Sequence, residues 1–328
     1  MVETYGDVTG EYLALRRESG LVEGQHGMVW VRGPEARSFL EGLLTQHLEQ
    51  VPPGAVARSL LLAPQGKLRA TLWVLRGDQD VGLITELERR EVLVGDLERF
   101  RIRVKAVVEP EPAPVLELWG PGSNQALEAA RLPIPEGWVA GDEVTVARAP
   151  LANLTRYFLT GIEPGALMAA GARPVGSLAA TAVRVEAGEP RMGVDIDEAT
   201  IPQESGLVPE TVSFDKGCFL GYELVARIDS RGRVNRHLRG VEIRENVRPP
   251  EGAELVAGGR VVGRLSSLAE SLTLRAPVGL ALVRREIEPG EEVELRWEGG
   301  SAPAVLRALP MDDFSDPPAM RISGGASA

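Results

Sequence analysis

The chain of 328 residues contains little cysteine, histidine or lysine. A single cysteine, Cys218, excludes an internal disulfide. It cannot by itself supply a zinc or iron–sulfur site, since such sites need several convergent ligands. The three histidines, at positions 26, 47 and 237, are scattered without ligand spacing. The sequence therefore supports neither a zinc site nor a Ser-His-Asp triad.

Long apolar runs are also missing. No run approaches the roughly 20 residues needed to span a bilayer. Residues 1–17 have no basic segment followed by an apolar core, so we expect no secretory signal and a cytoplasmic protein. A net charge of −11 and a pI near 5.0 argue against sequence-independent nucleic-acid binding, although a local basic patch is compatible with them.

The composition is that of an ordinary soluble globular protein, with 44% hydrophobic and 25% charged residues. A chain of this length forms two or three structural units. A strand, a Gly-Pro turn and an amphipathic run follow one another twice, around Gly33-Pro34 and again around Gly120-Pro121. This weak repeat predicts two similar α+β halves.

Other segments carry local signals. Residues 59–62 and 68–75 are predicted to form a hairpin that turns at residues 63–66. The remaining predictions are a helix over 86–100, a strand over 101–108, a helix over 177–187 capped by Gly188, and short strands after Arg239 at 241–243, 260–265, 278–283 and 292–297. Strands of this kind indicate a small antiparallel barrel or sandwich, and residues 315–328 are expected to fray.

The run Lys216-Gly217-Cys218-Phe219-Leu220-Gly221-Tyr222-Glu223 holds the sole thiol and one of only three lysines, the other two being Lys67 and Lys105. A nearby cation favours the reactive thiolate, so Lys216 is a candidate activator of Cys218. The alternative is that Cys218 is a small buried hydrophobe, as free cysteines commonly are. The spacing leaves both interpretations open.

This run resembles the K-G-C-[FY]-x-G-Q-E signature of the YgfZ family, which are folate-binding relatives of the glycine-cleavage T-protein. The resemblance continues, in order, in Gly33-Pro34-Glu35-Ala36 with Phe39-Leu40, in Pro64-Gln65-Gly66-Lys67, in the run from Arg184 to Arg191, in Gly193-Val194-Asp195-Ile196-Asp197 with Ile201-Pro202-Gln203-Glu204, and in the run from Val278 to Glu286. It implies an α+β fold of three subdomains: two similar, interleaved α+β units within a folate-binding region at 1–240, an antiparallel β-barrel at 241–314, and a flexible tail at 315–328.

The chain departs from these relatives at two places. Tyr222 stands where the YgfZ family usually has glutamine, so one phenol donor replaces an amide with two. Arg69 and Ala70 stand where the T-protein has two aspartates that include its catalytic acid. Loss of both carboxylates removes the proton acceptor and the partner for an iminium-like cation, which argues against aminomethyl transfer by the T-protein machinery.

The resemblance also implies a ligand site for tetrahydrofolate or a one-carbon derivative. Glu186 matches the glutamate that binds the pterin in the T-protein, and Asp195 and Glu204 are lesser candidates; the alternative places Glu186 on a solvated helix face. An arginine-rich stretch is a candidate for the anionic glutamate tail of folate, or is the solvated side of a hairpin turning at Gly232. Its members are Arg227, Arg231, Arg233, Arg236 and Arg239. Tyr222 completes the predicted site.

Three functions remain open at this point. The first, implied by the resemblance, is a tetrahydrofolate-binding accessory protein that supports iron–sulfur cluster assembly or repair, including enzymes of tRNA modification. Its partners are iron–sulfur client proteins or assembly factors, and Cys218 with Lys216 forms its thiol site. The second is a folate-dependent one-carbon transferase of the aminomethyl type, and the third is an interaction scaffold without a ligand.

Overall fold

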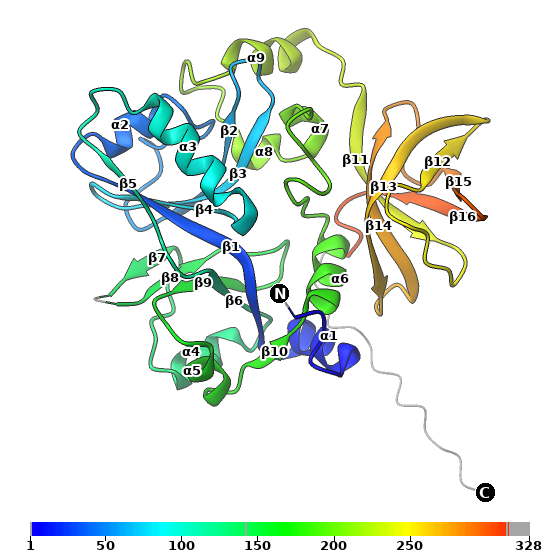
Figure 1. Cartoon of the computed structure of the whole chain (residues 1–328), viewed down its shortest axis with the longest axis horizontal. Helices are drawn as coiled ribbons and strands as arrows, with labels where there is room; N and C mark the ends of the chain where they lie inside the picture. Colours follow the sequence, from blue (N-terminus) through cyan, green and yellow to red (C-terminus); the bar gives the residue numbers. More distant parts are fainter. Residues whose placement is uncertain (1, 142, 313, 315–328) are drawn as a thin grey trace, which may run out of the picture.

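The computed structural model describes residues 2–141, 143–312 and 314. Within these residues, ten strands form one sheet and six others close into an antiparallel barrel (Figure 1). The strands of the sheet are β1 (Gly20–Arg32), β2 (Val56–Leu62), β3 (Leu68–Arg76), β4 (Val81–Glu86), β5 (Val107–Pro110), β6 (Val115–Trp119), β7 (Trp138–Ala140), β8 (Thr145–Arg148), β9 (Arg156–Thr160) and β10 (Arg173–Val175). The barrel strands are β11 (Arg236–Ile243), β12 (Glu254–Ala257), β13 (Arg260–Ser271), β14 (Ala276–Arg284), β15 (Glu292–Trp297) and β16 (Gly300–Arg307). This architecture confirms the predicted α+β class with a C-terminal antiparallel barrel.

Helices cover the sheet and link it to the barrel. They are α1 (Val8–Arg17), α2 (Ala36–Glu41), α3 (Arg90–Phe100), α4 (Ser123–Ala129), α5 (Pro164–Ala169), α6 (Ser177–Ala187), α7 (Pro202–Ser205), α8 (Val208–Thr211) and α9 (Tyr222–Arg231), with a 3₁₀ turn, η1, at Leu87–Arg89. We call β2, β3 and β4 with α2 and α3 the first half, and β6 to β9 with α4 and α5 the second half.

Strand β1 joins the two halves. Its residues 26–31 pair antiparallel with β4, and its residues 20–26 pair with β6. The register shifts between Glu23 and His26, as at a β-bulge, which bends a strand and re-aims its side chains. His26 therefore lies at the point where the sheet passes from one half to the other.

The two halves repeat the predicted strand, Gly-Pro turn and helix. Gly33 follows β1 and precedes α2, and Gly120 follows β6 and precedes α4. Both glycines have positive φ, 126° at Gly33 and 112° at Gly120. A Cβ added at Gly33 would lie 2.7 Å from the carbonyl oxygen of Lys105, and one added at Gly120 would lie 2.4 Å from that of Glu18. Only glycine fits at either turn.

Several local predictions are confirmed and others are wrong. The hairpin β2–β3 and the helix α6, with Gly188 left-handed as its cap, lie where predicted. The predicted strand over 101–108 is wrong: its first residues form bends, Arg103 has φ of 59°, and only β5 at the end of the range is extended. Gly232 ends α9 and does not form the tip of a hairpin. The tail at 315–328 lies outside the described residues.

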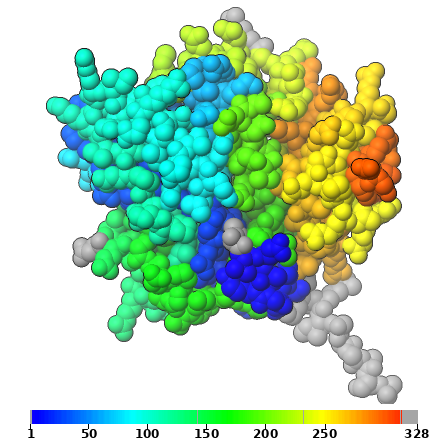
Figure 2. Space-filling view, in the orientation of Figure 1, coloured from blue at the N-terminus to red at the C-terminus, as the bar shows by residue number. Residues whose placement is uncertain are grey.

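One hydrophobic core ties the barrel to the sheet. It combines residues of α1, of α6 and of β13 and β14, among them Leu15, Val183 and Leu280. The chain between α6 and α9 fills the seam between the first half and the barrel, as the green segment of Figure 2 shows. No helix among the described residues is long and apolar enough to cross a membrane.

Candidate functional site

The two halves and the barrel enclose a cavity of about 970 Å³. Its walls come from β2 and β3, from the loop after β8, from the end of α6, from α8 and the turn before it, from β11, and from residues 308–310 after the barrel. Ligand pockets commonly have volumes of about 300–1,000 Å³ and lie at domain interfaces. This cavity is therefore the main candidate for a ligand site.

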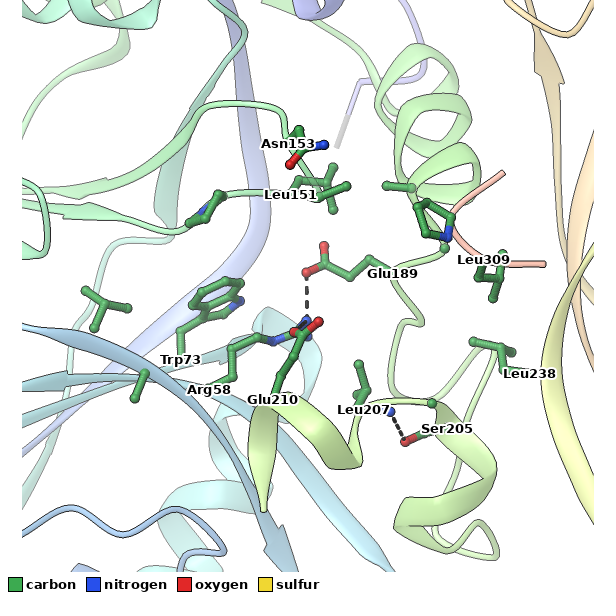
Figure 3. Close-up of a pocket in the computed structure, with 18 of the residues that line it drawn as sticks. Arg58, Trp73, Leu151, Asn153, Glu189, Ser205, Leu207, Glu210, Leu238 and Leu309 are labelled. Carbon is green, nitrogen blue, oxygen red and sulfur yellow. Dashed lines mark hydrogen bonds and ion pairs between the residues drawn. The ribbon is translucent and has the colours of Figure 1, made fainter. Parts of the chain in front are cut away.

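Arg58 forms the polar centre of the cavity wall (Figure 3). Its Nη1 donates to Glu210 Oε2 at 3.0 Å, and its Nη2 lies 3.6 Å from Glu189 Oε1. The guanidinium also stacks over the Trp73 ring, 4.9 Å from the centroid. Apolar side chains, among them Leu207 and Leu309, line much of the remaining wall, which also carries the charged side chains of Glu136, Arg148 and Arg239. The cavity thus combines apolar surface with a few convergent charges.

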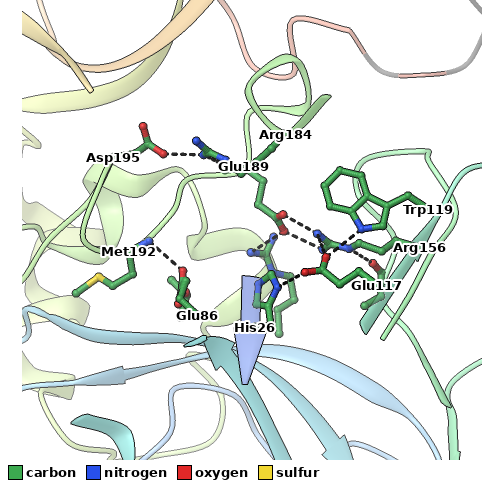
Figure 4. A network of polar contacts seen from close by, with 12 residues as sticks. His26, Glu86, Glu117, Trp119, Arg156, Arg184, Glu189, Met192 and Asp195 are labelled. Atoms are coloured by element: carbon green, nitrogen blue, oxygen red, sulfur yellow. Dashed lines mark hydrogen bonds and ion pairs between the residues drawn. The ribbon is translucent and has the colours of Figure 1, made fainter. Parts of the chain in front are cut away.

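Behind this wall lies a network of buried charges (Figure 4). Arg156 on β9 donates to both carboxylate oxygens of Glu189, at 2.8 and 3.0 Å, and lies 4.0 Å from Glu117 on β6. Glu117 in turn accepts from Trp119 Nε1 at 3.0 Å and contacts His26 Nδ1 at 2.7 Å. The network joins β1, β6 and β9 to the end of α6, where the three parts of the molecule meet.

The network controls the protonation of its members. Burial alone would raise the pKa of Glu189, but the guanidinium groups of Arg156 and Arg58 outweigh burial and lower that pKa to about 2. For His26 burial alone would lower the pKa, whereas the carboxylate of Glu117 raises it above the ordinary value. His26 also lines a small pocket of about 30 Å³ that shares Arg58, Trp73 and Glu189 with the main cavity.

Glu186 does not line this cavity. Its side chain is fully buried and accepts hydrogen bonds from Tyr12 of α1, at 2.8 Å to each oxygen, and from Ser271 of β13. Both interpretations made from the sequence therefore differ from the structure: the helix face is not solvated, and the carboxylate does not face the cavity. The reason is local: α6 ends at Ala187, and the cavity is lined by the residues from Ala187 to Glu189, whereas Glu186 is covered by α1 and β13.

The lesser candidates are engaged elsewhere and do not line the cavity either. Asp195 is buried and accepts from Arg184 at 2.7 Å; Glu204 on α7 forms a two-pronged ion pair with Arg236 of β11 at 2.8 and 3.0 Å. Arg227 is exposed on α9, and the Tyr222 ring packs edge-on against Phe219. Among the arginines of the predicted stretch whose side chains the structure describes, Arg239 alone lines the cavity.

Lys216 and Cys218 point to different environments. The Lys216 ammonium is buried and donates to the carbonyl oxygens of Glu41, Leu44 and Gln46 at 2.6, 2.6 and 3.0 Å. These contacts use all three N–H donors of the ammonium, which caps carbonyl groups at and just after the C-terminal end of α2. The predicted activation of the Cys218 thiol by Lys216 therefore finds no support. Cys218 is exposed, so it is not the buried hydrophobe of the alternative interpretation.

The positions that match the aspartates of the T-protein also lie outside the cavity lining. Arg69 forms a two-pronged ion pair with Asp96 of α3 at 2.8 and 3.1 Å, and Ala70 is buried on β3. The first half therefore presents a structural ion pair at this position.

Sequence reasoning missed most of the cavity residues. Arg58, Trp73, Glu189 and Glu210 stand in no recognisable motif, although Glu189 lies within the run from Arg184 to Arg191 that carries the resemblance. Arg156 gave no signal either, because its acidic partners are 33 and 39 residues away along the chain.

Comparisons with known proteins agree with this architecture. The glycine cleavage T-protein C-terminal barrel domain matches residues 236–313. The chain is similar to the aminomethyltransferases of Rubrobacter xylanophilus, with 28% identity over 98% of this chain and 90% of the relative, and of Streptomyces coelicolor, with 29% identity over 93% and 90%. It also shares the fold of the glycine cleavage system aminomethyltransferase T from Bartonella henselae, with a TM-score of 0.87, 22% identity and coverage of 95% of this chain and 91% of that one. The chain is therefore similar to aminomethyltransferases over more than nine tenths of its length, and residues 236–313 match the barrel domain of the glycine cleavage T-protein.

Proposed function

We propose that the protein is a folate-dependent one-carbon transferase of the aminomethyl type, which binds tetrahydrofolate or a one-carbon derivative in the central cavity. The observation that carries this proposal is the similarity to aminomethyltransferases over more than nine tenths of the chain, combined with a cavity where the three parts meet. These relatives favour a transferase over the accessory role that we predicted first.

The cavity residues fit a reduced folate. Apolar side chains such as Leu207 and Leu309 offer contact surface for a flat ring system. The donor edge of a pterin needs a carboxylate with free acceptor positions. Both carboxylate oxygens of Glu189 accept hydrogen bonds from Arg156. Glu210 on α8 is exposed, and among the described residues its carboxylate forms an ion pair with Arg58 alone. Glu210 therefore replaces Glu186 as the proposed pterin ligand.

Replacing Glu210 by glutamine should weaken the binding of 5-formyltetrahydrofolate about tenfold, because a hydrogen bond to a charged group contributes about 1.5–3 kcal/mol and this carboxylate is partly solvated. Glu186→Gln should change the affinity less than twofold, since Glu186 does not line the cavity. Isothermal titration of both variants and the wild type tests this pair. The reverse order of effects would restore Glu186 as the ligand, and no binding by the wild type would favour a ligand-free scaffold.

Bound tetrahydrofolate would supply the nitrogen that carries the one-carbon unit, either accepting it or donating it. The protein's own contribution is to hold the ring, to exclude water with the apolar wall, and to place charges that stabilise a developing cation. Because Arg69 and Ala70 carry no carboxylate, proton transfer must use a group other than the aspartates of the T-protein.

A second candidate function is the folate-binding accessory role in iron–sulfur cluster assembly or repair, within the YgfZ family. Two observations favour it: Cys218 is exposed, and the acid positions hold Arg69 and Ala70. An exposed thiol is accessible to a cluster, a persulfide or an oxidised thiol on a partner, and its thiolate is the reactive form.

Turnover separates the two functions. A transferase should convert methylene-tetrahydrofolate over many cycles with an amine or thiol acceptor, and Cys218→Ser should retain that activity. The accessory role predicts no multiple turnover, and Cys218→Ser should then abolish support of iron–sulfur enzymes, such as tRNA methylthiolases, in a deletion strain while leaving folate binding intact. Ser230→Ala on the neighbouring exposed helix is the matched control for both assays. Multiple turnover by the wild type rules out a purely accessory role, and its absence with every acceptor rules out the transferase.

A further inference from the structure

The two ring nitrogens of His26 have different surroundings. Nδ1 lies 2.7 Å from Glu117 Oε1, and an ionised carboxylate only accepts, so Nδ1 donates to Glu117. The Glu117 side chain is inaccessible to solvent and also accepts from Trp119 Nε1, which fixes its orientation. His26 Nε2 forms no hydrogen bond within the described part of the chain and is not one of the polar atoms sealed from solvent there. Because Nδ1 keeps its proton for Glu117, Nε2 is the nitrogen that gains and loses one.

The small pocket beside His26 connects this nitrogen with the main cavity. The His26 side chain is 15% exposed and lines this pocket of about 30 Å³, which shares Arg58, Trp73 and Glu189 with the main cavity. A water molecule needs about 10–15 Å³ of such space, so there is room for about two. Thr71 in the same wall offers a polar partner for a water. A proton can therefore move between Nε2 and the cavity along a water.

The charges around the imidazole are of both signs and come from every neighbouring element. The acids are Glu86 of β4, Glu88 of η1, Glu117 of β6 and Glu189 after α6, and the arginines are Arg58 of β2, Arg156 of β9, Arg184 of α6 and Arg191. Glu117 is in direct contact with the ring, and it raises the pKa of His26 against burial and the charge of Arg156. The ring therefore keeps its second proton to a higher pH than ordinary imidazole, which suits a proton donor.

We propose that His26 is the proton-transfer residue of the transferase, with Nε2 exchanging protons with the reacting nitrogens in the cavity and Glu117 positioning the ring. This inference rests on the proposed function and names the group that takes the place of the absent aspartates at Arg69 and Ala70. An imidazole with one nitrogen held by a carboxylate and the other directed at the reaction is a suitable general acid and base.

The proton balance of the reaction matches one such residue. Transfer of a methylene group from the folate to a primary amine breaks two C–N bonds, forms a C=N bond on the amine, and moves two protons from the amine nitrogen to the folate nitrogens. His26 in its charged form donates a proton to a folate nitrogen as the bond from that nitrogen to the methylene carbon breaks. His26 in its neutral form then takes a proton from the amine nitrogen. A second round of the same exchange completes the balance, and no oxidant or reductant is needed.

His26→Gln tests the role in turnover, because glutamine can still donate to Glu117 but cannot exchange a proton. General acid–base catalysis contributes about 10²–10⁴-fold, so kcat with methylene-tetrahydrofolate and an amine acceptor should fall about hundredfold or more. KM should stay within about threefold, since binding is not altered. The matched control is His47→Gln, which lines neither pocket and should keep the wild-type kcat.

The pH profile separates proton transfer from a structural role. With an aromatic amine that is neutral over the whole range, the wild-type kcat should fall as the pH rises through the pKa of His26, because the donor form is lost. His26→Gln should lack this limb. NMR of protein labelled with nitrogen-15 histidine measures the same pKa without turnover. The chain has only three histidines, so His26→Gln and His47→Gln assign the signals.

The NMR pKa of His26 should equal the kinetic one, and 5-formyltetrahydrofolate should shift the Nε2 signal of His26 and leave that of His47 unchanged. A kcat of His26→Gln close to the wild type, or a kinetic pKa that differs from the NMR value, overturns the role of His26 while the transferase stands. If His26→Gln does not fold, the two pKa values of the wild type decide. Absence of turnover by the wild type with every acceptor overturns the proposed function and the role of His26 together.

Discussion

Replacing Arg156 by methionine is expected to lower the free energy of unfolding by about 3–5 kcal/mol, because removal of one partner leaves buried charges without compensation. Arg156 and Glu117 are nearly inaccessible to solvent, and Glu189 depends on the same guanidinium for its low pKa. Methionine has a similar length and apolar character, so packing is retained while the charge is lost. The decrease in the free energy of unfolding should therefore measure the electrostatic contribution of Arg156.

Urea unfolding followed by tryptophan fluorescence measures this effect. Adding Glu189→Gln to Arg156→Met should recover part of the lost stability, since the second change removes one of the orphaned charges. The control Arg264→Met breaks an exposed pair with Glu254 and should cost about 0–1 kcal/mol. A loss below about 1 kcal/mol for Arg156→Met would mean that the network does not hold the halves together. If that variant does not fold, Arg156→Lys, which keeps the charge but loses the two-pronged geometry, gives the same comparison.

The second large effect concerns pH. Burial raises the pKa of Glu186 from its ordinary value of 4.5 to about 7, against the hydrogen bonds from Ser271 and Tyr12 and the charge of Arg16; Asp312 raises it further. A folded-state pKa above the unfolded value means that folding favours the protonated form. The stability contributed by this group is thus fully present below pH 4.5 and is lost as the pH rises to about 7.

Glu186→Gln should remove this loss. The amide keeps an acceptor for Tyr12 or Ser271 and cannot ionise, so the variant should be more stable than the wild type at pH 8 by up to about 3 kcal/mol, and within about 1 kcal/mol of it at pH 4.5. Unfolding curves of both proteins at pH 4.5, 6 and 8 give the comparison. Glu251→Gln, on an exposed turn, should follow the wild type throughout. If the free energy of unfolding depends on pH in the same way for the wild type and Glu186→Gln, burial does not raise the pKa of this carboxyl group.

Local signals in the sequence predicted what local physics determines. The Gly-Pro turns require a positive φ beside a neighbouring carbonyl, and Gly188 ends α6 in the left-handed conformation that glycine favours. Residues with such constraints can be located without knowing the fold. The alternating runs after residue 239 likewise led to the barrel.

The site depended on contacts that no local signal records. Glu186 and Glu189 are three positions apart, but α1 and the barrel cover one of them while the other turns into the cavity beyond the helix end. Lys216 and Cys218 are two positions apart, yet Gly217 between them has φ of 83°, and the lysine reaches back to α2. Closeness in sequence therefore does not place the two members of either pair in the same environment.

The continuity of β1 limits how the molecule can deform. Because this strand carries ladder hydrogen bonds to β4 and to β6, a change in the angle between the halves would break backbone pairing. The barrel has no such ladder to the ten-stranded sheet among the described residues and is held by side-chain packing and ion pairs such as Arg236 to Glu204. Displacement of the barrel is thus the least costly way to widen the cavity, with the ten-stranded sheet acting as the rigid base.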